Sequence, residues 1–124
     1  MIDHFGINCA DLQKTASFYD KVLATLGHRR LLDFEVAVGY GTDKPDFWLS
    51  TFDDVGPNRE VHLAFTAPDA DAVRAFFEAA VDLGAEVLHE PRLWPEYHEH
   101  YFGGFVRDPE GNNLEAVCHT GDRA

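Results

Sequence analysis

The chain has 124 residues, of which 45% are hydrophobic, so it can build one packed domain and is not intrinsically disordered. Acidic residues outnumber basic residues by 22 to 10, which gives a formal net charge of −12 at pH 7. A charge of this sign repels nucleic-acid phosphates and anionic lipid, so we expect no nucleic acid and no membrane among the partners.

One pattern of residues occurs twice, once in each half of the chain. His4 lies seven residues before Asp11, and His62 lies seven residues before Asp69. An aromatic pair follows each aspartate at the same distance, and a Leu-Gly pair closes each segment. Repetition of this kind predicts two copies of one supersecondary unit.

Each copy predicts a strand, a helix and three further strands. Side chains alternate between apolar and polar in the strand segments, and apolar residues recur at three- and four-residue spacing in the helix segments. Asp11 and Asp69 are suited to cap the first helical turn, and a glycine is suited to the turn that ends a helix. In chain order the first copy predicts strand 2–9, a helix from Asp11 to Gly27, and strands 29–34, 36–41 and 46–52. The second copy predicts strand 60–66, a helix from Asp69 to Gly84, strand 85–89, an irregular stretch over 90–100, and strands 101–107 and 113–118.

These elements predict an α+β fold made of two βαβββ repeats, with both helices on one side of the strands. We expect a single domain over residues 1–119. It divides into repeat one at 1–52, a linker at 53–59 with the composition of a loop, and repeat two at 60–119. Residues 120–124 are expected to form a flexible tail.

Three of the predicted strands each place one metal-binding side chain on the face away from the helix: His4, His62 and Glu115. Two imidazoles and one carboxylate suit a divalent transition metal that keeps coordination positions open for a substrate. A single histidine on a strand is more often a hydrogen-bonded structural residue. Because His4 and His62 hold equivalent places in the repeat, the metal site is as good an interpretation as the structural one.

Three segments carry more specific information: Ile2-Asp3-His4-Phe5-Gly6, Val61-His62-Leu63-Ala64-Phe65 and, above all, the long segment from Phe105 to Glu115 that contains Asp108-Pro109-Glu110-Gly111-Asn112. Together they resemble the vicinal oxygen chelate superfamily, which includes glyoxalase I, extradiol dioxygenases, fosfomycin-resistance enzymes and bleomycin-resistance proteins. The resemblance covers about residues 1–119. It implies that the repeats form a curved, half-open barrel with the helices on its outer face. It also implies metal ligands on the first, fifth and eighth strands, which are the positions of His4, His62 and Glu115.

The function that the resemblance implies is that of a metal-dependent enzyme. A divalent ion of Fe, Mn, Ni, Co or Zn would bind vicinal oxygens of a small substrate, with lyase, dioxygenase and transferase reactions all open. Glyoxalase I enzymes usually supply a fourth ligand, a glutamate, from the fourth strand, where this chain has Trp48. Because an indole neither binds the metal nor takes a proton, the ligand set is closer to that of dioxygenases and fosfomycin-type transferases. The alternative is a metal-free small-molecule-binding protein of the bleomycin-resistance type.

Catalytic candidates lie in and next to the irregular stretch. His98 and His100 share a face if that stretch is extended, and imidazoles there can act as acid or base near neutral pH. A solvated polar loop is the alternative interpretation. Tyr101 follows them and can donate a hydrogen bond to a bound oxyanion.

Three residues are candidates for lining a substrate pocket: Trp48, Phe105 and Asn8. Asn8 shares a strand face with His4, and the two aromatic residues can give the pocket an apolar wall. Aromatic residues in a small domain are usually part of the core, so that interpretation stays open for Trp48 and Phe105.

The expected surroundings of the protein follow from its cysteines and from the resemblance. Cys9 and Cys118 are too few for a disulfide framework, and we expect them to be buried in a protein of the reducing cytoplasm. The resemblance implies a small-molecule substrate and a homodimer, in which βαβββ units pair within or between chains. Whether His4 and Glu115 meet in one chain or across a dimer stays open at this point.

Overall fold

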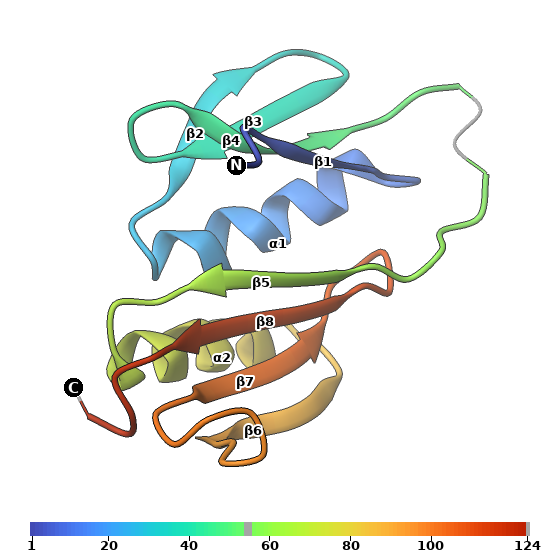
Figure 1. Cartoon of the computed structure of the whole chain (residues 1–124). Coiled ribbons are helices and arrows are strands. Elements are labelled where there is room, and N and C mark those ends of the chain that lie inside the picture. The colour runs from blue at the N-terminus through green and yellow to red at the C-terminus, as the bar shows by residue number, and fades with distance from the viewer. Residues whose placement is uncertain (54–55, 124) are drawn as a thin grey trace.

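The computed structural model describes residues 1–53 and 56–123 and contains two βαβββ modules (Figure 1). The first module consists of β1 (Phe5–Asn8), α1 (Leu12–Ala24), β2 (Arg29–Asp33), β3 (Ala37–Gly41) and β4 (Pro45–Ser50). The second consists of β5 (His62–Thr66), α2 (Ala70–Asp82), β6 (Val87–Leu93), β7 (Phe102–Arg107) and β8 (Asn113–Cys118). Outside the described residues lie Asp54 and Val55 of the predicted linker and Ala124 of the predicted tail.

Both helices begin directly after the predicted capping aspartates, whereas α1 ends at Ala24 and α2 at Asp82, before the predicted Gly27 and Gly84. Oδ1 of Asp11 accepts a hydrogen bond from the backbone N–H of Lys14, and Asp69 does the same for Ala72. These contacts satisfy N–H groups that the first helical turn leaves without partners. After the helices, Gly27 and Gly84 adopt φ angles of 83° and 88°, a conformation that disfavours other residues.

Each module forms its own four-stranded mixed sheet with one parallel pair. The strand orders are β1-β4-β3-β2 and β5-β8-β7-β6, so β1 and β5 are equivalent edge strands. Each edge strand runs parallel to the last strand of its module. Helix α1 packs on the first sheet, α2 packs on the second, and the two helices contact each other. The predicted α+β fold of two βαβββ repeats is therefore confirmed, and the two sheets are not closed into a barrel.

The irregular stretch predicted at 90–100 is wrong in its first part, because β6 continues to Leu93. Pro91 lies inside this strand, where its missing N–H would disrupt a central ladder. Strand β6 is at the sheet edge, and its pairing with β7 shifts register between His89 and Arg92. An edge position combined with a bulge is the context in which a strand tolerates proline.

Aromatic side chains join the cores of the two modules. Phe47 of β4 packs against Tyr19 of α1 and, edge to face, against Phe65 of β5. Phe65 in turn packs on Phe76 of α2. These aromatic contacts extend from one module to the other, so burial of apolar surface holds the modules together.

The turn between β7 and β8 forms a second, polar connection between the modules. Asp108 accepts a 2.6 Å hydrogen bond from the hydroxyl of Tyr19. The carboxylate of Glu110 accepts hydrogen bonds from the backbone N–H groups of Ala10 and Asp11 and from the hydroxyl of Thr15, at 2.9–3.2 Å. An acidic side chain from the second module therefore caps the start of α1 in the first.

Other features of the chain agree with its composition. Within the described residues no helix is long and apolar enough to cross a membrane. Cys9 and Cys118 are both free and buried, as predicted. Burial raises the pKa of the Cys9 thiol to about 12, which makes this residue a poor nucleophile.

Candidate functional site

A cavity of about 570 Å³ lies between the first module and strand β5. The segment that precedes β1 contributes His4 and Asp3, and β5 contributes His62. The remaining walls are largely apolar, with one carboxylate from Asp46; the residues that line the cavity are Ile2, Asp3, His4, Phe5, His28, Asp46, Phe47 and 62–66. Two of the three predicted metal ligands, His4 and His62, thus face the same space although they belong to different modules.

His62 and Glu115 lie side by side on the face of the second sheet that points away from α2. Nε2 of His62 is 3.0 Å from Oε1 of Glu115, and Nδ1 of His62 is 3.1 Å from the backbone oxygen of Asn113. Since that oxygen only accepts, Nδ1 carries a proton and Nε2 is the nitrogen directed at the carboxylate. The hydroxyl of Tyr101 donates a hydrogen bond to the other carboxylate oxygen, Oε2.

Burial has the largest effect on the pKa of Glu115. Glu115 is only 1% exposed, and its loss of hydration raises its pKa, while the Tyr101 hydroxyl and the His62 imidazole act in the opposite direction. Burial and the nearby carboxylate both raise the pKa of Tyr101, so its hydroxyl keeps its proton and stays a donor. The carboxylate is thus held at both oxygens by partners that stabilise its charge.

The position of Gly103 explains how the carboxylate fits under the sheet surface. A Cβ atom added to Gly103 would lie 2.9 Å from Oε2 of Glu115 and 3.3 Å from the ring of Tyr101. Only a residue without a side chain leaves the space in which these two groups meet.

His62 and Glu115 are suited to hold a divalent ion, and His4 is separate from them. An imidazole whose second nitrogen donates to a backbone carbonyl is oriented as metal-binding histidines usually are, and a metal ion would replace the proton that the 3.0 Å contact between Nε2 and the carboxylate requires. His4 instead places Nδ1 2.8 Å from Oδ1 of Asp3. The described residues contain no group of three His, Cys, Asp or Glu side chains that could hold a metal ion. The donor set therefore fits a metal through two of its predicted ligands.

Trp48 occupies the place in the first module that Glu115 occupies in the second. Gly6 of β1 pairs with Trp48 of β4, and Ala64 of β5 pairs with Glu115 of β8. Since Gly6 follows His4 by two residues as Ala64 follows His62, the two rows are equivalent. The first module thus has an indole where the second has its carboxylate.

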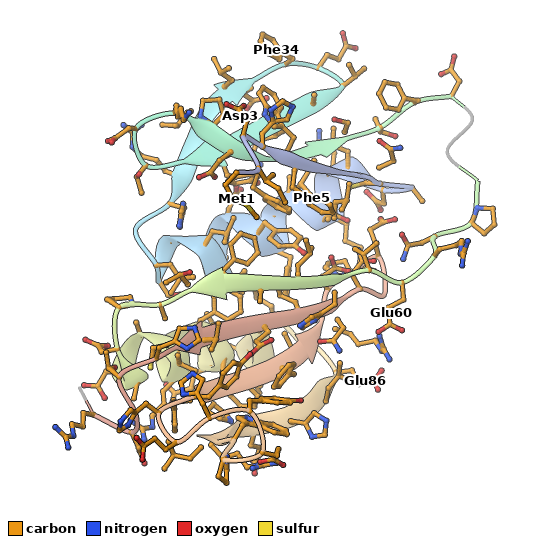
Figure 2. The ribbon with its side chains drawn as sticks, viewed as in Figure 1. Met1, Asp3, Phe5, Phe34, Glu60 and Glu86 are labelled. Atoms are coloured by element: carbon orange, nitrogen blue, oxygen red, sulfur yellow. The ribbon has the colours of Figure 1, made fainter. Side chains whose placement is uncertain are left out.

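The three predicted pocket residues lie apart from one another. Phe105 stacks on the ring of His62 with the centroids 5.9 Å apart and so borders the His62–Glu115 pair. Trp48 stacks on Phe34, which Figure 2 shows at the edge of the first module that is farthest from the second. Asn8 is exposed at the end of β1. In the described part of the chain, none of the three is among the residues lining the 570 Å³ cavity.

The predicted catalytic histidines lie in the loop between β6 and β7. Nε2 of His98 is 2.8 Å from Nδ1 of His119, and Nε2 of His100 is 3.3 Å from a carboxylate oxygen of Glu99. Of the three catalytic candidates, Tyr101 is the one that contacts Glu115. Sequence reasoning missed His119, although the alternation that assigns Glu115 to the face away from the helix continues through residue 117 to residue 119.

The comparisons with known proteins agree with the fold of two modules. Residues 4–117 match the family of glyoxalase-like domains. A glyoxalase/bleomycin resistance protein from Albidiferax ferrireducens T118 is 23% identical, with a TM-score of 0.83 over 94% of this chain and 97% of that one. A lactoylglutathione lyase from Agrobacterium tumefaciens is 20% identical, with a TM-score of 0.71 over 97% of this chain and 94% of that one. The fosfomycin resistance protein FosX from Mesorhizobium loti is 16% identical, with a TM-score of 0.68 over 95% and 91% of the two chains.

At these identities the similarity to solved structures shows the fold and leaves the reaction undecided. A search of curated proteins gives no match to this sequence. The family match covers nearly all of both modules, including His4, His62 and Glu115. The chain therefore belongs to the glyoxalase-like domains of the vicinal oxygen chelate superfamily.

Proposed function

We propose that this protein is a metal-dependent enzyme that acts on a small molecule bound at the cavity between its modules. The observation that carries the proposal is the contact between Nε2 of His62 and Oε1 of Glu115, at 3.0 Å, beside a cavity that His4 also lines. His62 and Glu115 would hold a divalent ion of Fe, Mn, Ni, Co or Zn, with His4 as the third ligand. When bound, such an ion supplies Lewis-acid chemistry by polarising neighbouring oxygen atoms of a substrate.

The side chains around the proposed centre have separate tasks. The backbone oxygen of Asn113 fixes the orientation of His62, and Tyr101 holds Oε2 of Glu115 so that Oε1 stays directed at His62. Phe105 covers one face of the imidazole and limits the access of water to it. The Phe5, Phe47 and Phe65 side chains give the cavity apolar walls, which suits a small organic substrate.

Replacing His62 with alanine should lower the affinity for the divalent ion by at least about 100-fold, because it removes a ligand and not merely a supporting contact. The measurement is a titration of chelator-treated protein with Mn²⁺, Fe²⁺, Ni²⁺ and Zn²⁺, together with elemental analysis of protein purified without a nickel column. The His28→Ala variant removes an imidazole that lines the same cavity outside the proposed ligand set, and it should keep the metal content.

The same titration tests the second candidate function, a metal-free small-molecule-binding protein. The contact of His4 with Asp3, away from the His62–Glu115 pair, favours this alternative. Unmodified protein that takes up none of the four ions would replace the enzymatic proposal with the metal-free one. A His62→Ala variant with unchanged metal affinity would show that the ligand assignment is wrong.

We also propose a homodimer in which His4 of one copy and His62 and Glu115 of another complete one centre. The proposal rests on the placement of these residues in different modules and on the separation of His4 from the pair. If it holds, a His4→Ala chain mixed with a His62→Ala chain should recover metal binding in a fraction of sites, because one of the two centres in a mixed dimer is intact. A centre formed within one chain gives no recovery on mixing.

A further inference from the structure

Two imidazoles outside the proposed metal centre face each other at one end of the second sheet. His98 lies in the loop between β6 and β7, and His119 directly follows β8. Nε2 of His98 is 2.8 Å from Nδ1 of His119, and the rings stack with their centroids 5.0 Å apart. Figure 1 shows this loop and the segment after β8 at the same end of the sheet. The contact therefore joins two segments that are 21 residues apart in sequence.

The hydrogen bonds of the pair determine where its protons are. The backbone N–H of His100 donates to Nδ1 of His98 at 3.1 Å, so this nitrogen carries no proton. Neutral His98 then has its proton on Nε2 and donates it to Nδ1 of His119. It follows that the single proton of neutral His119 is on its Nε2.

An additional proton on either ring alters this arrangement. A proton on Nδ1 of His98 would face the backbone N–H of His100. A proton on Nδ1 of His119 would face the proton on Nε2 of His98. In the first case only the bond from His100 is lost, and Nε2 of His98 still donates to His119; when both rings carry an additional proton, two donors face each other and the contact is lost.

The ring of Tyr101 packs against both members of the pair. Its centroid is 5.5 Å from that of His98 and 5.4 Å from that of His119, with interplanar angles of 74° and 87°. The hydroxyl at the far end of the same side chain donates to Glu115. The two imidazoles thus form a wall that fixes the tyrosine whose hydroxyl holds the buried carboxylate.

We propose that His98 and His119 form a positioning pair that keeps Tyr101 on Glu115 and that separates once both imidazoles carry an additional proton. The sign follows from the donors: the pair is formed at high pH and is lost in acid, where both facing nitrogens carry protons. The effect of this change on catalysis rests on the proposed function, whereas the pair itself does not.

The groups around the pair that titrate or carry charge come from several elements. Strand β8 contributes Glu115, whose carboxylate interacts with the charge of His119. The loop contributes Tyr101, and also His100 together with its partner Glu99. Asp122, three residues after His119, is paired with Arg74 of α2.

Nuclear magnetic resonance of the ¹⁵N-labelled full chain tests the proposal without substrate or metal. At about pH 8, long-range ¹H–¹⁵N correlations should show protons on Nε2 of both His98 and His119. On lowering the pH to about 5, the ring signals of Tyr101 should change together with those of the two imidazoles. A proton on Nδ1 of His98 at pH 8, or Tyr101 signals that do not follow the pair, would overturn the proposal.

Variants separate a positioning role from a merely structural one. His119→Asn keeps an acceptor at the same place along the side chain, so Tyr101 should keep its wild-type signals at high pH. His119→Phe removes the acceptor and should shift those signals at every pH, and His119→Phe with wild-type Tyr101 signals would also contradict the proposal. His100→Gln keeps the backbone N–H that matters and serves as the control, with the titration of Tyr101 unchanged. Since no measurement involves a ligand, failure of the metal proposal leaves these results unaffected.

Discussion

Replacing Asp108 with alanine should lower the free energy of unfolding by about 3–5 kcal/mol, because it breaks a buried network that joins the modules. Asp108 is 4% exposed and accepts hydrogen bonds from the Tyr19 hydroxyl, from the side-chain amide of Asn112 and from the backbone N–H groups of Glu110 and Asn112. Tyr19 and Asn112 are both fully buried, so their donors would lose their partner without gaining water. For a domain of this size the loss corresponds to a fall in Tm of roughly 10–20 °C, measurable by calorimetry and by urea denaturation.

A milder variant in the same network and a control at an exposed aspartate elsewhere define the cause. Tyr19→Phe removes one donor and leaves Asp108 with three, so we expect a loss of about 1–2 kcal/mol. Asp82→Ala removes an exposed carboxylate from the last turn of α2 and should change the stability by less than about 0.5 kcal/mol. If Asp108→Ala resembled Asp82→Ala, the polar connection between the modules would contribute nothing, and the aromatic contacts of Phe47 and Phe65 alone would hold them together.

The contrast between Asp11 and Asp108 shows which parts of the fold the sequence could predict. Asp11 bonds to a backbone N–H three residues away, and such a local contact follows from residue type and position. The turn that contains Asp108 also follows from local sequence, because Pro109 and Gly111 are residue types that favour a turn. Its partner Tyr19 lies 89 residues earlier, and nothing in the local sequence indicates that contact. Contacts between the modules depend on tertiary packing, which local sequence patterns do not encode.

The candidate site likewise combines contacts that the sequence predicts with contacts that it does not. Strand alternation together with the family resemblance assigned His62 and Glu115 to one face, and the ladder between β5 and β8 brings them together. His4 precedes the first residue of β1, so no ladder fixes its backbone, and its side chain bonds to the neighbouring Asp3. Alternation also could not predict the contact of Tyr101 with Glu115, because it requires Gly103 to leave space at one point of the sheet.

Because the contact between Tyr101 and Glu115 needs this space, a side chain at Gly103 should have a large effect. Replacing Gly103 with alanine should reduce the affinity for the divalent ion by about 10–100-fold, in the range seen when the supporting contacts of a metal ligand are lost. The new Cβ would lie 2.9 Å from Oε2 of Glu115, and the carboxylate is too buried to move aside freely. The ring of Tyr101 would be 3.3 Å from the same Cβ, so it would be pushed aside and its hydroxyl would lose its acceptor as well. Metal titration measures the first effect, and the ring signals of Tyr101 measure the second in protein without metal.

Gly104 provides a matched control on the opposite face of the same strand. Its added Cβ would lie 2.9 Å from the ring of Pro91 on β6 and so would be crowded to a similar degree. Both variants should therefore lose about 1–3 kcal/mol of stability through overpacking. Only Gly103→Ala should alter the signals of Tyr101 and the affinity for metal, because only that side chain enters the space between Tyr101 and Glu115. If the two variants behaved alike in every measurement, the effect would come from strain in β7, and the carboxylate would not depend on the space that Gly103 leaves.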